Sequence, residues 1–279
     1  MTHRLSGEHI ATGLIWALGL IVIVLLAAIV GDILRGGFSG FDPAFLLQDP
    51  MDAGRGGGIR SVLVSTVMIL AVFLTVAAPV GLLAGIFLAD TTRRSARLRR
   101  PIRISLDTLA GVPSIVFGLF GNAVFAVFFG LRLSILAGGL TLAVMVMPFL
   151  VRSVEESLRA LPEELVQAGA ALGLQRTTLL GRILLPAALP GLASGLLLGT
   201  GRALAETAAL LFTSGYALRM PQGVSDPGRS LSIHILDLAF NVPGGTLNAY
   251  KSAAVLLVIL VSLNSAVMLL ARRRKTAVV

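Results

Sequence analysis

Six long apolar stretches constrain the fold of this chain more than any other feature of its sequence. They cover residues 11–31, 62–89, 108–131, 133–151, 183–214 and 252–271. A helix needs about 20 apolar residues to cross the hydrocarbon core of a bilayer, which each stretch can supply. Only 13% of the 279 residues are charged, whereas soluble domains carry about 25%. The sequence therefore predicts an all-α integral membrane protein with about six transmembrane helices.

The distribution of basic residues predicts how these helices are oriented. The net charge of +9 does not indicate nucleic-acid binding, because the basic residues cluster in short segments between the apolar stretches. Fifteen Lys and Arg residues fall on one side of the predicted membrane and seven on the other. The richer side is expected to be cytoplasmic, so both termini lie inside and the first stretch is an uncleaved anchor. The third and fourth stretches flank Arg132, which predicts two neighbouring helices joined by a tight outer turn.

The inner connection 153–182 is too structured for a simple linker. Pro162 and the acidic residues Glu163 and Glu164 suit the first turn of a helix, and Gly173 suits its end. An apolar stripe at helical spacing comprises Leu158, Leu161, Leu165, Ala168 and Leu172. The connection is therefore predicted to be a helix–turn–helix element across the inner face. An amphipathic helix at the lipid interface is an alternative, but the acidic polar face favours a docking surface for another protein.

A charged pair interrupts the fifth apolar stretch. Arg202 and Glu206 are the only charged residues between Ile183 and Leu218. At a spacing of four residues they would share one helix face and could pair, and small residues around them permit close approach of a neighbour. Two interpretations remain open: a structural ion pair that locks the bundle, or a guanidinium that faces the translocation path and binds an oxyanion.

The motifs of several catalytic and binding classes are missing from the sequence. The only Lys residues are Lys251 and Lys275, and neither belongs to the Gly-Lys-Ser/Thr loop that holds nucleotide phosphates. No zinc-protease motif or serine nucleophile elbow occurs, so we expect no enzyme activity, no cofactor and no metal. The outer connections 35–60 and 215–249 are polar and rich in glycine and proline. For the second, a solvated loop packed on the outer helix ends is favoured over a metal or substrate site built from Asp226, Arg229, His234, Asp237 and Asn241.

Part of the inner connection resembles the EAA loop of ABC importer permeases. The stretch "QAGAALG", nine further residues and "ILLP" reproduce the family spacing at Gly173, Ile183, Leu185 and Pro186. Gln167 stands where the family has glutamate, so a salt bridge from that position is not carried over, and Gly169 replaces an alanine. The resemblance implies a coupling helix that inserts into a separate ATP-hydrolysing subunit. The residues it assigns to this coupling are Glu164, Gln167, Ala168, Gly173 and Leu174.

A wider resemblance runs from about residue 60 to the C-terminus. The stretches "LAGVPSIVFGLFG" (109–121), "GRALAETAALLFTSG" (201–215) and "YKSAAVLLVIL" are similar to the PstA-type permeases of phosphate ABC importers. The resemblance places Arg202, Glu206 and Thr207 on positions implicated in phosphate passage. It implies a MetI-like fold in a bacterial inner membrane. The implied partners are a PstB-like ATPase dimer, a PstC-like second permease and a PstS-like external phosphate-binding protein.

Together with these resemblances, the sequence predicts a permease subunit that forms half of the translocation pathway of an ATP-driven importer for inorganic phosphate and couples to a separate ATPase. The predicted organisation is an anchor helix and outer loop (1–60), a permease domain (61–272) and a cytoplasmic tail (273–279). A first alternative is an ABC permease for sulfate, molybdate or phosphonate, which would share the coupling loop. A second is a secondary transporter or channel without an ATPase, for which an inverted repeat would argue, and none is visible.

Overall fold

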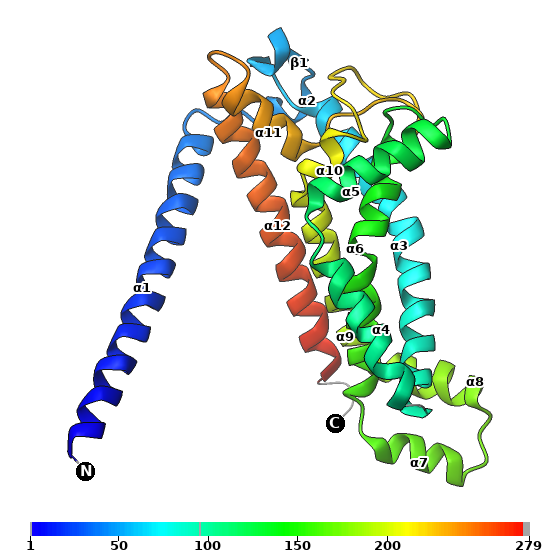
Figure 1. Cartoon of the computed structure of the whole chain (residues 1–279). Coiled ribbons are helices and arrows are strands. Elements are labelled where there is room, and N and C mark those ends of the chain that lie inside the picture. Colours follow the sequence, from blue (N-terminus) through cyan, green and yellow to red (C-terminus); the bar gives the residue numbers. More distant parts are fainter. Residues whose placement is uncertain (1, 95, 276–279) are drawn as a thin grey trace.

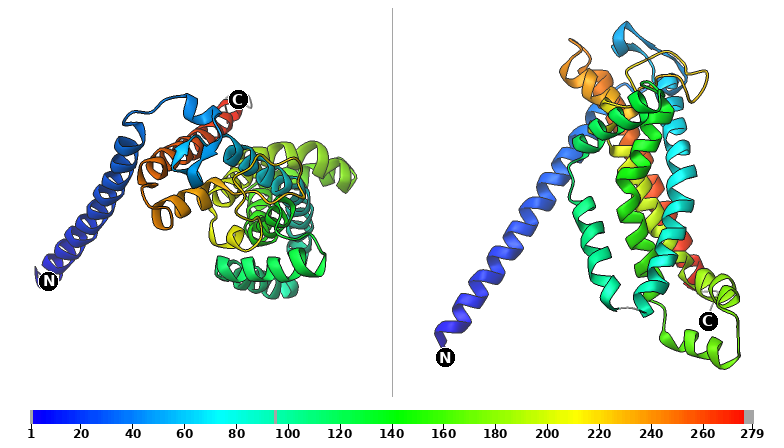
Figure 2. Two further views of the ribbon diagram at one scale, coloured as in Figure 1. Left: turned by 90° about the horizontal axis from the view of Figure 1, so that it is seen from above. Right: turned by 45° about the vertical axis from the view of Figure 1, so that its right-hand side comes forward.

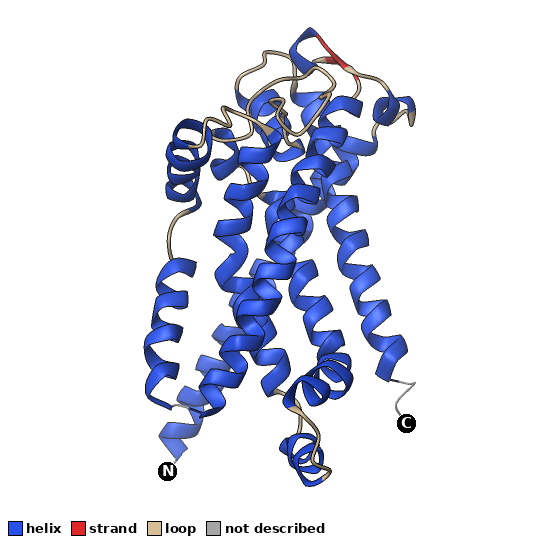
Figure 3. Cartoon of the chain, turned by 90° about the vertical axis from the view of Figure 1, so that its right-hand side faces the viewer, coloured by secondary structure: helices blue, strands red, loops and turns tan. Residues whose placement is uncertain are grey.

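The computed structural model describes residues 2–94 and 96–275, and its side-chain packing is described for residues 12–90 and 100–266. Most of the described chain is helical, and one short strand pair, β1 (Pro50–Met51) and β2 (Gly56–Gly57), lies in an outer loop (Figure 3). The predicted all-α fold is confirmed. Of the tail expected at 273–279, residues 276–279 lie outside the described residues.

Five long helices match five of the six predicted spans. They are α1 (Thr2–Phe38), α3 (Arg60–Arg94), α6 (Ile135–Arg159), α9 (Leu185–Ala205) and α12 (Thr246–Lys275). The fifth span begins earlier than predicted, because α8 (Arg176–Leu179) and the π-helical segment η3 (Leu180–Leu184) lead continuously into α9. It also ends earlier, at Ala205 instead of residue 214.

The predicted third span is not a straight helix. It consists of α4 (Ala96–Ala110), α5 (Ser114–Gly121) and the π-helical segment η2 (Asn122–Phe128), with a bend of 88° between α4 and α5. The bend lies at Gly111–Pro113, where proline disfavours a helical residue before it and cannot donate a backbone hydrogen bond. The prediction of one helix across 108–131 is therefore wrong. The tight turn expected near Arg132 is confirmed, and Arg132 there has a φ of 57°.

The core of the molecule lies between α3 and α6. Phe73 of α3 and Leu142 of α6 are fully buried in it, together with Ile135 at the start of α6. Helix α9 packs on the other side of α6 through glycines spaced four residues apart, Gly191, Gly195 and Gly199. Such a small-residue stripe lets two helix backbones approach closely within a membrane. Of the small residues predicted to permit close approach around Arg202, Gly199 does so, and the rest of the glycine stripe lies earlier in α9.

Helix α1 stands apart from the bundle along most of its length (Figures 1 and 2). Its outer end contacts α12, where Gly36 and Gly37 lie against Tyr250 and the Tyr250 hydroxyl donates to Asp32 at 2.8 Å. Its apolar side chains are otherwise exposed, as shown by Trp16 at 76%. Within the described residues α1 therefore contributes little to the core.

Short elements cover one end of the bundle, which we call the outer end. They are α2 (Ala44–Leu47), the strand pair, the 3-10 helix η1 (Asp52–Gly54), α10 (Ala208–Leu211) and α11 (Leu231–Phe240). Helix α7 (Glu163–Ala171) and α8 lie at the opposite end, and α1 begins and α12 ends on that same side (Figure 1). This arrangement separates two candidate sites: the inner loop at α7 and α8, and the outer end of α9.

Candidate functional site

Helix α7 forms where the sequence predicts it. Pro162 precedes its first residue, and Glu163 and Glu164 occupy its first turn, where negative charge is favourable. Leu165 and Val166 pack against the inner part of the bundle, and Gly169 is buried against Leu179. One face of α7 is thus held against the segment that leads into α9.

The turn after α7 confirms the predicted role of Gly173 as a helix cap. Gly173 has a φ of +67°, the left-handed conformation that glycine adopts at little cost. Its N–H donates to the Ala170 carbonyl at 3.0 Å, and the Leu174 N–H donates to the Gly169 carbonyl at 3.0 Å. This pair of bonds is the Schellman arrangement, which satisfies the last carbonyls of a helix. The helix end therefore has a fixed shape that only a left-handed residue supports.

The outward side of α7 is open. Glu164, Gln167, Ala168 and Gly173 are exposed, whereas Leu174 is half-buried. The apolar side chain of Leu172 is 77% exposed at the end of the helix.

This exposure corrects the predicted apolar stripe from Leu158 to Leu172. Leu158, Leu161 and Leu165 do pack in one apolar cluster, whereas Ala168 and Leu172 are exposed, and Val166 and Gly169 pack in their place. The stripe is not that of one helix, because the chain leaves the helical conformation between Ala160 and Pro162.

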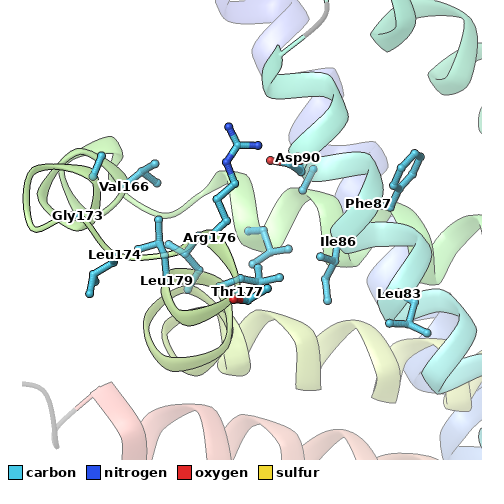
Figure 4. Close-up of a pocket in the computed structure, with 15 residues that line it drawn as sticks. Leu83, Ile86, Phe87, Asp90, Val166, Gly173, Leu174, Arg176, Thr177 and Leu179 are labelled. Atoms are coloured by element: carbon cyan, nitrogen blue, oxygen red, sulfur yellow. The ribbon is translucent and has the colours of Figure 1, made fainter.

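An apolar cavity of about 820 Å³ lies between this loop and the inner end of α3. Val166 and Leu174 line it from the loop, and Leu83, Ile86 and Phe87 line it from α3 (Figure 4). Arg176 and Asp90 lie along the same cavity. The loop is therefore not packed tightly against the bundle.

The second site is the outer end of α9, and here the structure corrects the sequence interpretation. Helix α9 ends at Ala205, and Glu206 has extended backbone angles, with φ −71° and ψ 131°. Arg202 therefore lies in the last turn of the helix, and Glu206 lies beyond it. Among the described residues no ion pair joins Arg202 to Glu206, so the expected pair on a single helix face is wrong.

The burial of α9 changes within its last two turns. Gly199 and Ala203 are buried, and Gly199 approaches Leu150 of α6. Arg202 is exposed, and Leu198, one turn earlier, is 57% exposed. The place of Arg202 in the last turn suits the negative end of the helix dipole.

The break after α9 is held by contacts from two other elements. The Ala209 N–H of α10 donates to Glu206 Oε1 at 3.2 Å, and the hydroxyl of Ser232 in α11 donates to the Glu206 carbonyl. Thr207, half-buried, separates the two helices and its hydroxyl lies 3.5 Å from the Ala205 carbonyl. The sequence did not reveal Ser232 as part of this site, because it lies 26 residues from Glu206 and belongs to no motif.

The outer segment 215–249 contains a buried polar cluster, not the solvated loop that was expected. Arg229 Nη1 donates to Asp237 Oδ2 at 2.7 Å, and Arg229 Nε donates to the Tyr216 carbonyl at 3.1 Å. His234 is fully buried beside them. Burial, and then the positive charge of Arg229, lower the pKa of His234 to about 4. His234 is therefore neutral at physiological pH.

A further charged cluster lies at the inner end of α6, and sequence reasoning missed it as well. Glu155 is 1% exposed and its Oε1 lies 3.2 Å from Arg159 Nε and 3.4 Å from Arg103 Nη2 of α4. The spacing of Glu155 and Arg159 by four residues was a visible signal for the first contact. Nothing in the sequence indicated the contact with Arg103.

Comparisons with known proteins place these features in context. Residues 81–276 match the family described as binding-protein-dependent transport system inner membrane component. The chain is 29% identical to the probable ABC transporter permease protein YqgI of Bacillus subtilis over 95% of each protein. It is 31% identical to the phosphate transport system permease protein PstA of Mycobacterium leprae, over 92% of this chain and 86% of that protein.

A solved structure shares the fold. The inward-facing MetNI methionine ABC transporter superposes with a TM-score of 0.58 at 22% identity, covering 78% of this chain and 96% of that one. This similarity supports the predicted MetI-like arrangement of helices.

Proposed function

This chain belongs to the binding-protein-dependent transport system inner membrane components, and from that premise we propose that it is a permease subunit of an ATP-driven importer for inorganic phosphate. The observation that carries the proposal is the exposed guanidinium of Arg202 at the end of an otherwise apolar span. The 31% identity to the phosphate transport system permease protein PstA of Mycobacterium leprae supports phosphate as the substrate.

The position of Arg202 favours a role in the translocation path. A guanidinium that faces lipid costs about 2.5–3.5 kcal/mol on insertion scales near the centre of a helix, and less toward its end. Because Arg202 is exposed among the described residues, we expect it to face a second permease subunit or a polar path. Its planar set of donors fits two oxygens of a tetrahedral anion. Glu206 and Thr207 then lie at the mouth of that path, in the break between α9 and α10.

The inner loop supports coupling to a separate ATPase. Helix α7 exposes Glu164, Gln167 and Ala168 on its outward side, and Gly173 fixes the shape of its end. An exposed Leu172 beside them offers the apolar contact that a protein partner would bury. ATP binding to the partner would move α7, and α7 is joined through the turn at Leu174 to the segment that leads into α9.

The proposed importer needs further protein subunits besides this chain. The chain would assemble with a PstC-like permease, a dimer of PstB-like ATPases and a PstS-like phosphate-binding protein on the outer side. It would lie in a bacterial inner membrane with both termini and α7 in the cytoplasm. The Lys and Arg count, fifteen against seven, supports that orientation.

Uptake by Arg202 variants tests the path assignment. In the assembled complex we expect Arg202→Ala to reduce phosphate uptake by about 10- to 100-fold, the effect of losing a charged bidentate contact. Arg202→Lys keeps the charge without the planar fork and is expected to fall between wild type and Arg202→Ala. Arg219→Ala, on an exposed outer arginine, is the matched control. Unchanged uptake by Arg202→Ala at normal membrane abundance would contradict the assignment.

A further inference from the structure

The inner end of α6 is tied to α4 by charged side chains. Glu155 of α6 contacts Arg103 of α4 at 3.4 Å, and Arg152 of α6 pairs with Asp107 of α4. Arg159, one turn after Glu155, contacts the same carboxylate oxygen as Arg103. Two ion pairs thus connect the two helices, one buried at Glu155 and one partly exposed at Asp107.

Burying the carboxylate of Glu155 at its position costs desolvation free energy. Its side chain is 1% exposed, and a buried carboxylate is stable only when charged or hydrogen-bonding partners replace water. A Leu or Met would fill the same space without that cost. The two guanidinium groups, one from each helix, indicate that the carboxylate joins the helices and does not merely fill the core.

The position of Glu155 along α6 connects it to the coupling loop. Helix α6 ends at Arg159 and α7 begins at Glu163, so only residues 160–162 separate them. The carboxylate therefore lies about two turns before the start of α7. A displacement of α7 would reach the Glu155 cluster through this short connection.

The other partner, α4, leads to the outer site. Beyond the bend at Gly111–Pro113 the chain continues as α5, which packs on α10. A methyl group on Gly118 would lie only 2.9 Å from the Cα of Ala209, and Asn122 donates to the Phe212 carbonyl at 2.7 Å. Helix α10 follows directly after the break at Glu206 and Thr207. The broken span thus contacts α6 near the coupling loop at one end and the outer break at its other end.

We propose that Glu155 is a positioning residue that joins α4 to the end of α6, so that movement of α7 is transmitted through α4 and α5 to α10 and the break at Glu206. The inference rests on the proposed function, because it requires an ATPase that moves α7. In this proposal the bent span transmits movement: α4 moves with α7, and α5 sets the position of the break at Glu206. Loss of the joint is expected to uncouple ATP hydrolysis from transport without preventing assembly.

The test measures ATP hydrolysis and phosphate uptake together in the reconstituted complex. Glu155→Gln keeps the shape of the side chain and removes its charge. We expect normal assembly and ATP hydrolysis, with about five- to tenfold less phosphate transported per ATP. Glu156→Gln, which changes the exposed neighbour, is the matched control and should keep the wild-type ratio. A wild-type ratio in Glu155→Gln would overturn the proposal.

The partly exposed pair provides a second test that does not depend on a buried position. Asp107→Arg and Arg152→Asp, each alone, should lower the phosphate-to-ATP ratio, and the double variant should restore it. If Glu155→Gln fails to assemble, this exchange decides the question: an unrestored double variant refutes the joint. A wild-type complex that hydrolyses ATP but takes up no phosphate would instead refute the proposed function. That outcome differs from failure of the proposed joint, which only the variants report.

Discussion

Replacement of Gly173 tests the link between the local shape of α7 and ATPase binding. Gly173 has a φ of +67°, and an added Cβ would meet no atom within 4 Å. The cost of a side chain is therefore conformational and not steric. An L-residue in the left-handed region costs about 1–2 kcal/mol, with Ala near the lower value and the β-branched Val near the upper. Asn tolerates this region and should cost least.

These energies translate into a measurable loss of affinity. A penalty of about 1–2 kcal/mol shifts an equilibrium by a factor of about 5–30. Because the partner is expected to bind only the capped form of α7, its apparent affinity should fall by up to that factor. We expect the order wild type, Gly173→Asn, Gly173→Ala, Gly173→Val, from tightest to weakest.

The assay is titration of the purified ATPase against the permease in lipid nanodiscs. Gly181→Val is the control, since Gly181 lies in the same inner loop, has equally open surroundings and no left-handed backbone. Equal affinity of Gly173→Val and wild type would refute the reasoning. So would an equal loss in Gly173→Asn and Gly173→Val, because the effect would not follow backbone preference.

Two further predictions concern stability. A methyl group at Gly195 would lie 1.8 Å from Ser153 Oγ, so Gly195→Ala should destabilise the fold by about 1–3 kcal/mol. Thermal unfolding in detergent measures this loss, and adding Ser153→Gly should recover the stability. Gly201→Ala is the control and should have no effect, because the nearest atom to its added methyl group is 3.7 Å away. The pKa of His234 is about 4 in the folded protein and about 6.5 in the unfolded chain. As the pH falls from 6.5 to 4, only the unfolded state binds the proton, so the free energy of unfolding falls by up to about 3 kcal/mol. His234→Leu should remove this dependence between pH 7.5 and pH 5, and a slope that persists in the variant would assign it to another group.

The sequence predicted those features that depend on local physics. Five of the long apolar stretches form helices long enough to cross a bilayer, as their length predicts. The cap at Gly173 was predictable because a glycine after a helical pattern favours one backbone conformation. The start of α7 at Glu163 followed from the same kind of local signal at Pro162.

The features that depend on distant contacts could not be predicted. The break after Ala205 occurs in an apolar run without glycine or proline between residues 202 and 214, and it is held by Ser232 from another helix. The apolar pattern therefore favoured one continuous helix, and the pairing of Arg202 with Glu206 followed from that error. The contact between Arg103 and Glu155 joins residues 52 positions apart, and no periodic pattern in the sequence indicates it.

The most direct test of the account is ATP-dependent uptake of radiolabelled phosphate by proteoliposomes that contain this chain, its partner permease, the ATPase and the binding protein. We predict uptake that requires ATP and is not reduced by excess sulfate or phosphonate. Uptake of phosphate without ATP would indicate a channel or secondary transporter. Uptake of sulfate or phosphonate in place of phosphate would contradict the assignment of substrate while leaving the permease fold intact.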